Sequence, residues 1–266
     1  MSTQNWYLKI GRIASLALLV LVVMGFFWTP YDPSAMNSLD KLQGLSLTHL
    51  MGTDHFGRDI FSRVLQGAGT TVTIGLLTVV MGAVVGTLIG AITGYLGGWV
   101  DSLCMHVLDV ITAFPSVLLA LVLISVVGSG TTNVILVLGI VFTPSFARVT
   151  RSTFATLRTQ NFIQSARLMG VPTWRIVTVH LLPNIWSVLT PCLTIGFNNA
   201  VLAEASMSYL GVGVSPTDPS LGYMLSEAQG MLVTAPWYAL SVGMTIVVMI
   251  FAVGLWGEGL QKEAER

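Results

Sequence analysis

Six long apolar runs constrain the fold of this sequence more than any other feature. A membrane-spanning helix needs roughly 20 mostly apolar residues to cross about 30 Å of hydrocarbon. The runs lie at about residues 13–28, 70–95, 103–127, 133–149, 185–210 and 237–256. Only 9% of the 266 residues are charged, whereas soluble domains carry about 25% charged residues. The sequence therefore predicts an all-α, polytopic membrane protein with six transmembrane helices.

Charge and cysteine usage argue against several other classes of protein. The 12 Lys and Arg residues balance 12 Asp and Glu residues, so the chain has no basic field for a nucleic acid. Cys104 and Cys192 lie in apolar runs without CxxC spacing, which argues against a disulfide framework and a zinc site. His49 and His55 have Met51 between them but no third ligand nearby, and we predict no metal site.

The positive charges predict the orientation in the membrane, because Lys and Arg are retained on the cytoplasmic side. If the N-terminus is inside, the cytoplasmic set is Lys9, Arg12, Arg148, Arg151, Arg158, Arg167, Arg175, Lys262 and Arg266, and the outer set is Lys41, Arg58 and Arg63. This asymmetry predicts that both termini are cytoplasmic.

The same topology divides the chain into four parts. Residues 1–28 form a cytoplasmic N-terminus and an uncleaved anchor helix, since no small-residue cleavage site follows that helix. Residues 29–69 form an outer segment, and residues 70–257 form the transmembrane core, with a cytoplasmic loop at 150–184. Residues 258–266 form a cytoplasmic tail.

Small residues and prolines predict how the helices pack. The second run carries glycines at a spacing of four, which lie on one helix face: Gly82, Gly86, Gly90 and Gly94. Such a face lets two membrane helices approach closely. Two alternatives stay open for this face. It packs against another helix of this chain, or it forms a subunit interface or a mobile wall of a pore. Pro115 and Pro144 lie inside the third and fourth runs, and each is expected to kink its helix. Such kinks suit a moving pathway, for which Pro115 is a candidate, but they also occur in static bundles.

Glu204, His106 and Asp109 are ionisable residues inside apolar runs. A carboxylate in a membrane helix, such as Glu204 in the fifth run, usually faces a cavity or a partner. Glu204 therefore lies either on a pathway or interface, or in a structural hydrogen bond near the outer end of its helix. His106 and Asp109 are three residues apart in the third run, and we expect them to pair.

Three charged residues of the outer segment, Arg58, Asp59 and Arg63, alternate with apolar residues at amphipathic spacing. Two interpretations stay open. The residues belong to an interfacial helix that closes a pathway or touches a partner, or they form a solvated structural ion-pair cluster.

The cytoplasmic loop predicts a contact with another protein. Apolar residues recur in it at helical spacing, and Gly170-Val171-Pro172 then ends one helix and begins a second, which Pro183 closes. Arginines surround these apolar positions. A short helix-turn-helix exposed outside the membrane is suited to docking in a groove on a partner.

The loop contains Gln164-Ser165-Ala166, then Gly170, and ends with Leu182-Pro183. This pattern resembles the cytoplasmic loop of ABC-importer permeases, whose consensus is Glu-Ala-Ala, three residues, Gly, nine residues and Ile-x-Leu-Pro. Gln164 and Ser165 depart from Glu-Ala, and His180 replaces Ile. The resemblance implies that an ATPase-coupling surface is formed by Gln164, Ser165, Ala166, Arg167, Met169, Gly170, Val171, Pro172, Leu182 and Pro183.

Further motifs extend from about residue 31 to residue 262. They are GTDHFGRD at 52–59, SR at 62–63, GYLGGWVD at 94–101, AFPS at 113–116, SYLGVGV at 208–214, MLSE at 224–227, APW at 235–237 and GEGL at 257–260. Together they resemble the second permease subunit of dipeptide, oligopeptide and nickel importers. The resemblance implies an ABC type I importer permease fold in a bacterial inner membrane.

The resemblance also implies a function and a set of partners. It implies that this chain forms half of a pathway for di- and oligopeptides, with nickel or a metal chelate as the alternative cargo. The partners that the resemblance implies are a homologous second permease subunit, two ATP-binding subunits, a periplasmic or lipid-anchored solute-binding protein, and membrane lipid. In such a complex, ATP-driven closure of the ATP-binding subunits would pull the loop around Gly170 and switch the pathway from inward-facing to outward-facing.

The lysines agree with an external energy source. Lys9, Lys41 and Lys262 are the only lysines, and none lies in a Gly-x-x-x-x-Gly-Lys-[Ser/Thr] loop. We therefore expect no cofactor on this chain, with ATP and Mg²⁺ bound by partner subunits, and no enzymatic activity of its own. A stand-alone secondary carrier or channel is the alternative from another class, but such a protein has no use for an exposed loop of this length.

Overall fold

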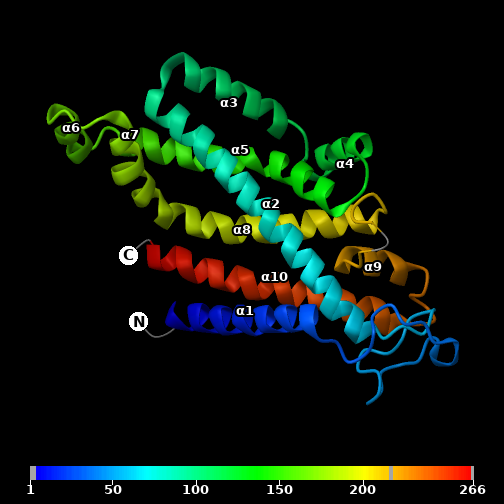
Figure 1. The fold of residues 1–266 in the computed structure, drawn as a ribbon. Coiled ribbons are helices and arrows are strands. Elements are labelled where there is room, and N and C mark those ends of the chain that lie inside the picture. The colour runs from blue at the N-terminus through cyan, green and yellow to red at the C-terminus, as the bar shows by residue number, and fades with distance from the viewer. Residues whose placement is uncertain (1–3, 216–217, 265–266) are drawn as a thin grey trace.

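The computed structural model describes residues 4–215 and 218–264, and within these ranges the chain is helical without an extended strand (Figure 1). Its elements are α1 (Gln4–Phe27), η1 (Ser38–Asp40), α2 (Ile60–Leu96), α3 (Gly98–Thr112), α4 (Ser116–Val127), α5 (Thr131–Leu157), α6 (Asn161–Leu168), α7 (Thr173–Arg175), η2 (Ile176–Leu181), α8 (Leu182–Tyr209), α9 (Leu221–Gln229) and α10 (Pro236–Ala264). Two pieces of the predicted terminal segments lie outside the described residues: 1–3 and 265–266. The positive charge of Arg266, which was counted for the orientation, is among them.

Five spans among the described residues are long and apolar enough to cross a membrane: α1, α2, α5, the continuous stretch from α7 to α8, and α10. A bent pair, α3 and α4, provides a sixth if it is one broken span. The predicted all-α, polytopic fold is confirmed.

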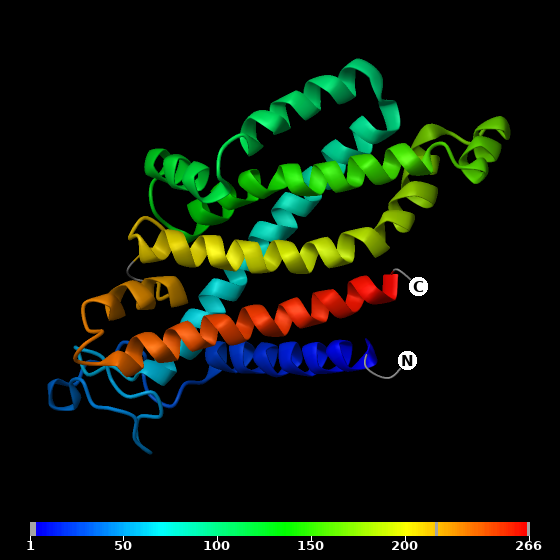
Figure 2. The same ribbon diagram turned by 180° about the vertical axis from the view of Figure 1, so that it is seen from behind.

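All long helices run between two ends of the molecule. α1 begins and α10 ends at one end, from which α6 and α7 project; we call it the loop end (Figures 1 and 2). The segment before α2 and helix α9 lie at the opposite end, here the far end. The first and last described helices therefore reach the same end of the molecule. This agrees with six crossings, in which α3 and α4 together count as one.

The third predicted helix is divided, where we expected one helix kinked at Pro115. α3 ends at Thr112, α4 begins at Ser116, and the two helix axes differ by 87°. Pro115 is the N-cap of α4. It has no backbone N–H to continue the α3 ladder, and it disfavours helical backbone at Phe114. Pro144, in contrast, lies inside the continuous helix α5.

Helix α2 begins at Ile60 rather than at residue 70, so the outer segment is shorter than predicted. The side chain of Asp59 caps the helix by accepting a hydrogen bond of 2.8 Å from the backbone N–H of Ser62. A hydropathy pattern does not predict this first part of α2, because Ser62 and Arg63 are polar. Both residues are nevertheless buried.

The four glycines of α2 pack directly against the backbone of α5. A Cβ at Gly82 would lie 3.3 Å from the carbonyl oxygen of Gly139, and one at Gly86 would lie 2.6 Å from that of Thr143. Gly90 and Gly94 face the next carbonyls of the same row, those of Ala147 and Arg151. The glycine face therefore joins two helices of this chain, which is the first of the two alternatives that the sequence left open.

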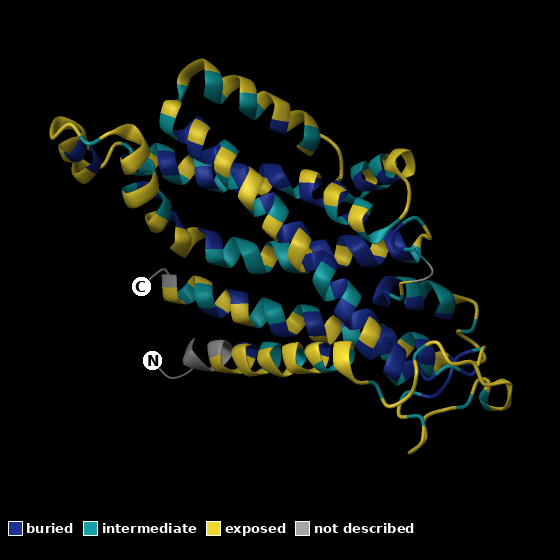
Figure 3. Cartoon of the chain, viewed as in Figure 1, coloured by how far each residue is buried: buried dark blue, intermediate teal, exposed yellow. Residues whose placement is uncertain are grey.

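Large parts of the helix surfaces stay exposed and apolar (Figure 3). On α2 the exposed residues from 76 to 92 are all Leu, Val or Ile. On α1 the exposed residues from 13 to 27 are likewise apolar. Such surfaces are stable in hydrocarbon, where no water competes for their contacts.

Candidate functional site

The loop at residues 150–184 forms a compact knob beyond the loop end. Helix α6 ends in a Schellman motif: the N–H of Val171 bonds to the Ala166 carbonyl at 3.0 Å, and that of Gly170 to the Arg167 carbonyl at 3.0 Å. Gly170 has φ +78°, a conformation that favours glycine. The chain thereby reverses, as the Gly170-Val171-Pro172 pattern predicts.

The knob has its own core and an apolar tip. Ile163, Ile176 and Leu181 are buried together with Phe154 of α5. At the tip, the side chain of Leu168 is 89% exposed and that of Met169 is 75% exposed. An exposed apolar tip on a well-packed base is suited to insertion into a groove on a partner.

The predicted coupling residues divide between tip and base. Gln164, Ser165, Arg167, Met169, Gly170 and Pro172 are exposed, whereas Ala166 is buried and Val171 and Leu182 are partly buried. The guanidinium of Arg167 lies 5.0 Å from the ring centre of Tyr95, which ties the knob to the end of α2.

Pro183 does not close the second helix of the loop, which corrects that prediction. It lies in the first turn of α8, and the helical stretch from α7 continues through it into the membrane. The wider π-helical turn η2 ends at Leu181, directly before α8 and two residues before Pro183. Such a turn re-routes the hydrogen bonds that a proline removes from a helix. The knob is thus rigidly continuous with α8.

Ion pairs fix the base of the knob between α3 and α5. Arg151 donates to Asp101 through Nε at 2.7 Å and through Nη2 at 2.5 Å. Arg148 donates to Asp109 at 2.8 Å. The predicted pairing of Asp109 with His106 is wrong, because Asp109 pairs with Arg148 instead. Nδ1 of His106 lies 2.6 Å from the carbonyl oxygen of Ser102.

A buried network of charges lies at the far end; we call Asp54, Arg58, Arg63, Glu227 and Tyr238 the Arg63 network. Arg63 donates to Asp54 and to Glu227, each at 2.7 Å. Arg58 donates to Asp54 at 2.6 Å and to Glu227 at 3.0 Å. Tyr238 donates to Glu227 at 2.9 Å. The network joins the segment before α2 to the three helices α2, α9 and α10.

Burial distinguishes this network from a solvated ion-pair cluster, which was one of the two interpretations of the sequence. The residue Arg63 is only 3% exposed, and Asp54 and Tyr238 are fully buried. Burial raises the pKa of Glu227, but the charges of Arg63 and Arg58 outweigh it and hold that pKa below its ordinary value.

Asp59 has a separate role from Arg58 and Arg63. Its carboxylate caps α2 at Ser62 and lies 2.9 Å from Nδ1 of His49. The residues that sequence reasoning missed are Asp54, Glu227 and Tyr238, although the first two lie in the motifs at 52–59 and 224–227.

Glu204 lies in a buried hydrogen-bond network near the far end of α8, which agrees with the structural alternative that the sequence left open. Its fully buried carboxylate accepts hydrogen bonds from Ser208 at 2.8 Å and from Thr71 at 3.2 Å. Those two hydroxyls in turn accept the N–H groups of Val214 at 3.2 Å and Leu221 at 3.1 Å. Glu204 thereby fixes the start of α9 against α2.

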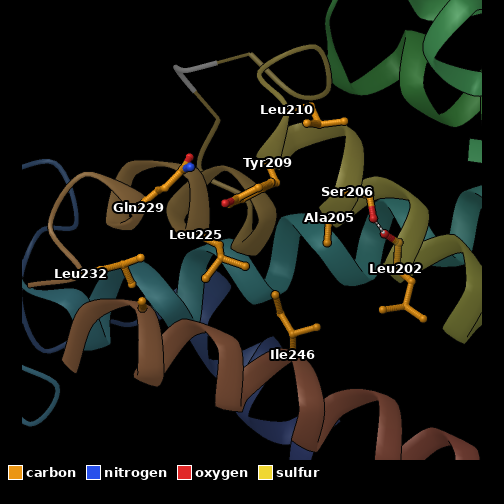
Figure 4. Close-up of a pocket in the computed structure, with 10 residues that line it drawn as sticks. Leu202, Ala205, Ser206, Tyr209, Leu210, Leu225, Gln229, Leu232 and Ile246 are labelled. Carbon is orange, nitrogen blue, oxygen red and sulfur yellow. Dashed lines mark hydrogen bonds between the residues drawn. The ribbon is translucent and has the colours of Figure 1, made fainter. Parts of the chain in front are cut away.

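A pocket of about 490 Å³ lies between α8, α9 and α10 near the far end (Figure 4). It is lined by Leu202, Ala205, Ser206, Tyr209, Leu210, Leu225, Gln229, Leu232, Ala239 and Ile246. The Tyr209 hydroxyl and the Gln229 amide extend toward one another from α8 and α9 (Figure 4). The pocket is thus apolar with a few uncharged polar groups, and no sequence motif indicates it.

A family model and the most similar curated proteins point to the same kind of protein. Residues 86–264 match the family described as binding-protein-dependent transport system inner membrane component. The chain is 40% identical over 252 residues to the glutathione transport system permease protein GsiD of Escherichia coli O157:H7, covering 93% of this chain and 83% of the relative. It is 42% identical over 247 residues to GsiD of Salmonella paratyphi A, covering 92% and 82%.

The fold is also that of a solved transporter. The inward-facing MetNI methionine ABC transporter aligns with a TM-score of 0.62 and 19% identity, covering 77% of this chain and 97% of the transporter chain. The chain therefore belongs to the inner membrane components of binding-protein-dependent transport systems, and it is a permease subunit of an ABC importer.

Proposed function

We propose that this chain forms half of the translocation pathway of an importer for glutathione and other short peptides. The observation that carries the proposal is 40% identity to a glutathione permease over 93% of the chain. Glutathione is a tripeptide, which agrees with the peptide cargo expected from the sequence motifs. Nickel or a metal chelate is the less favoured cargo.

The complete transporter, in this proposal, contains a homologous second permease, two ATP-binding subunits and a solute-binding protein. The two ATP-binding subunits bind ATP and Mg²⁺ and supply the energy, since none of the three lysines of this chain lies in a P-loop. The exposed tip at Leu168 and Met169 supports docking on one of them.

The loop end faces the cytoplasm in this proposal. The arginines of the knob and its base, Arg148, Arg151, Arg158, Arg167 and Arg175, lie at that end together with the described ends of α1 and α10. Retention of positive charge on the cytoplasmic side supports this orientation. The far end then faces the solute-binding protein.

Coupling follows from the way the knob is attached. Ile163 and Ile176 pack against Phe154 of α5, and η2 continues into α8 without a break. A displacement of the tip by the ATP-binding subunits is therefore passed to α5 and α8 together. Tilting these two helices opens one end of the pathway and closes the other.

Uptake by cells tests the cargo. A strain that lacks this chain but keeps the other subunits is expected to lose uptake of labelled glutathione and to regain it when the chain is supplied. Nickel uptake, measured in the same strains, is expected to stay unchanged. Restoration of nickel uptake alone would contradict the proposal. Uptake that persists when ATP is depleted and the proton gradient is kept would instead indicate a secondary carrier.

A further inference from the structure

One face of α8 stays exposed along most of the helix. Its exposed residues recur at helical spacing and are Val188, Ile195, Asn199, Leu202, Ser206 and Leu210. Asn199 lies well inside α8, which runs from Leu182 to Tyr209. Within the described residues its amide has no hydrogen-bond partner in the chain.

The exposed faces of neighbouring spans differ from this one. On α10 the exposed residues at comparable depth are Leu240, Met244, Val247, Val248 and Phe251. The exposed stretch of α2 from 76 to 92 is equally apolar. An amide without a hydrogen-bond partner is strongly disfavoured in hydrocarbon. The α8 face is therefore unsuited to lipid, whereas the α2 and α10 faces suit it.

The α8 face leads into the pocket at the far end. Leu202, Ser206 and Leu210 belong both to the face and to the pocket lining. Tyr209 and Gln229 add a hydroxyl and an amide at the pocket (Figure 4). Polar groups are thus present from the middle of the membrane to the far end, and the residues that line the pocket are uncharged.

We infer that the exposed face of α8 lines the translocation pathway and that Asn199, Tyr209 and Gln229 hydrogen-bond to the peptide in transit. The inference rests on the proposed function. Amide side chains both donate and accept, so they match the N–H and C=O groups of a peptide backbone. Uncharged groups do not hold the charged ends of a peptide tightly, and they allow it to leave again.

Thiol labelling tests the position of the face. In a chain carrying Cys104→Ala and Cys192→Ala, Asn199→Cys is compared with Val247→Cys in the assembled transporter in lipid vesicles. Val247 is the matched control, because it is 50% exposed and lies at a similar distance from the far end of α10. A membrane-impermeant, charged thiol reagent is expected to label Asn199→Cys at least about tenfold faster, because only thiolates in water react. Equally slow labelling of both would overturn the inference.

Transport kinetics test the contact with cargo. Asn199→Leu is expected to raise the KM for glutathione uptake at least about threefold, since one hydrogen bond contributes about 1 kcal/mol. Asn199→Gln, which keeps an amide, is expected to restore most of the loss. Unchanged kinetics in Asn199→Leu would disprove the contact. The labelling experiment does not depend on the cargo. Fast labelling of Asn199→Cys in a transporter that does not take up glutathione would therefore contradict the proposed cargo and still support the position of the α8 face on the pathway.

Discussion

Arg63→Met is expected to lower the stability of the chain by about 3–5 kcal/mol, because it leaves buried carboxylates without their main partner. Asp54 and Glu227 each accept a hydrogen bond of 2.7 Å from Arg63. Arg58 alone cannot neutralise both. A loss of this size is a large part of the roughly 5–15 kcal/mol that stabilises a typical domain. Thermal unfolding of the purified chain in detergent measures the effect.

Arg148→Met is the matched control for this substitution. Arg148 also pairs with a carboxylate, at 2.8 Å, but its side chain is 44% exposed and that of Asp109 is 61% exposed. Exposed pairs contribute only about 0–1 kcal/mol. The double variant Arg63→Met, Glu227→Met is expected to recover part of the lost stability, since Asp54 keeps Arg58 as a partner. Equal unfolding temperatures for the two single variants would show that the Arg63 network is not stabilising.

Gly86→Val is expected to separate α2 from α5 and to destabilise the chain by at least about 1–3 kcal/mol through overpacking. A Cβ at Gly86 would lie 2.6 Å from the Thr143 carbonyl oxygen and 2.7 Å from Cβ of Phe146. Neither atom can move without a shift of the α5 backbone. The unfolding temperature and the yield of folded protein after detergent extraction measure this effect.

Gly243→Val controls for placing a β-branched residue in a membrane helix. Gly243 lies in α10, and a Cβ there would have no atom within 4 Å. Its substitution is expected to change stability by less than about 1 kcal/mol. Similar losses at both positions would contradict the packing role of the glycine face.

The helices were predictable from sequence because apolar length alone specifies a membrane span. The same criterion failed where polar residues are buried inside a helix. The first turns of α2 contain Ser62 and Arg63, which hydropathy counts as exposed although both are buried. Pro115 predicted a disturbance of the third span, but its size, a bend of 87°, depends on packing that the local sequence does not encode.

The knob was predictable in part because its features are local. Gly170 specifies a left-handed turn, and its effect needs no distant contact. The prediction that Pro183 ends a helix was wrong. A proline in the first turn of a helix and a proline that follows the end of a helix cannot be told apart from the local sequence.

The Arg63 network was missed because its members come from distant parts of the chain. Arg63 and Glu227 are 164 positions apart, and their pairing needs the tertiary fold. The motifs at 52–59 and 224–227 contained two of its carboxylates, but a motif does not indicate which residues meet. Glu204 likewise needed the positions of Thr71 and Ser208 before its structural role was evident.

Coupling through the knob is the central claim of this account, and co-purification of the ATP-binding subunits tests it most directly. The double variant Leu168→Asp, Met169→Asp changes only exposed tip residues, and it is expected to fold normally, lose the ATP-binding subunits and lose uptake. Leu47→Asp is the control, since Leu47 is 99% exposed in the outer segment at the opposite end. We predict that Leu47→Asp keeps both subunits and uptake. A tip variant that retains the ATP-binding subunits and transports at the wild-type rate would contradict the account.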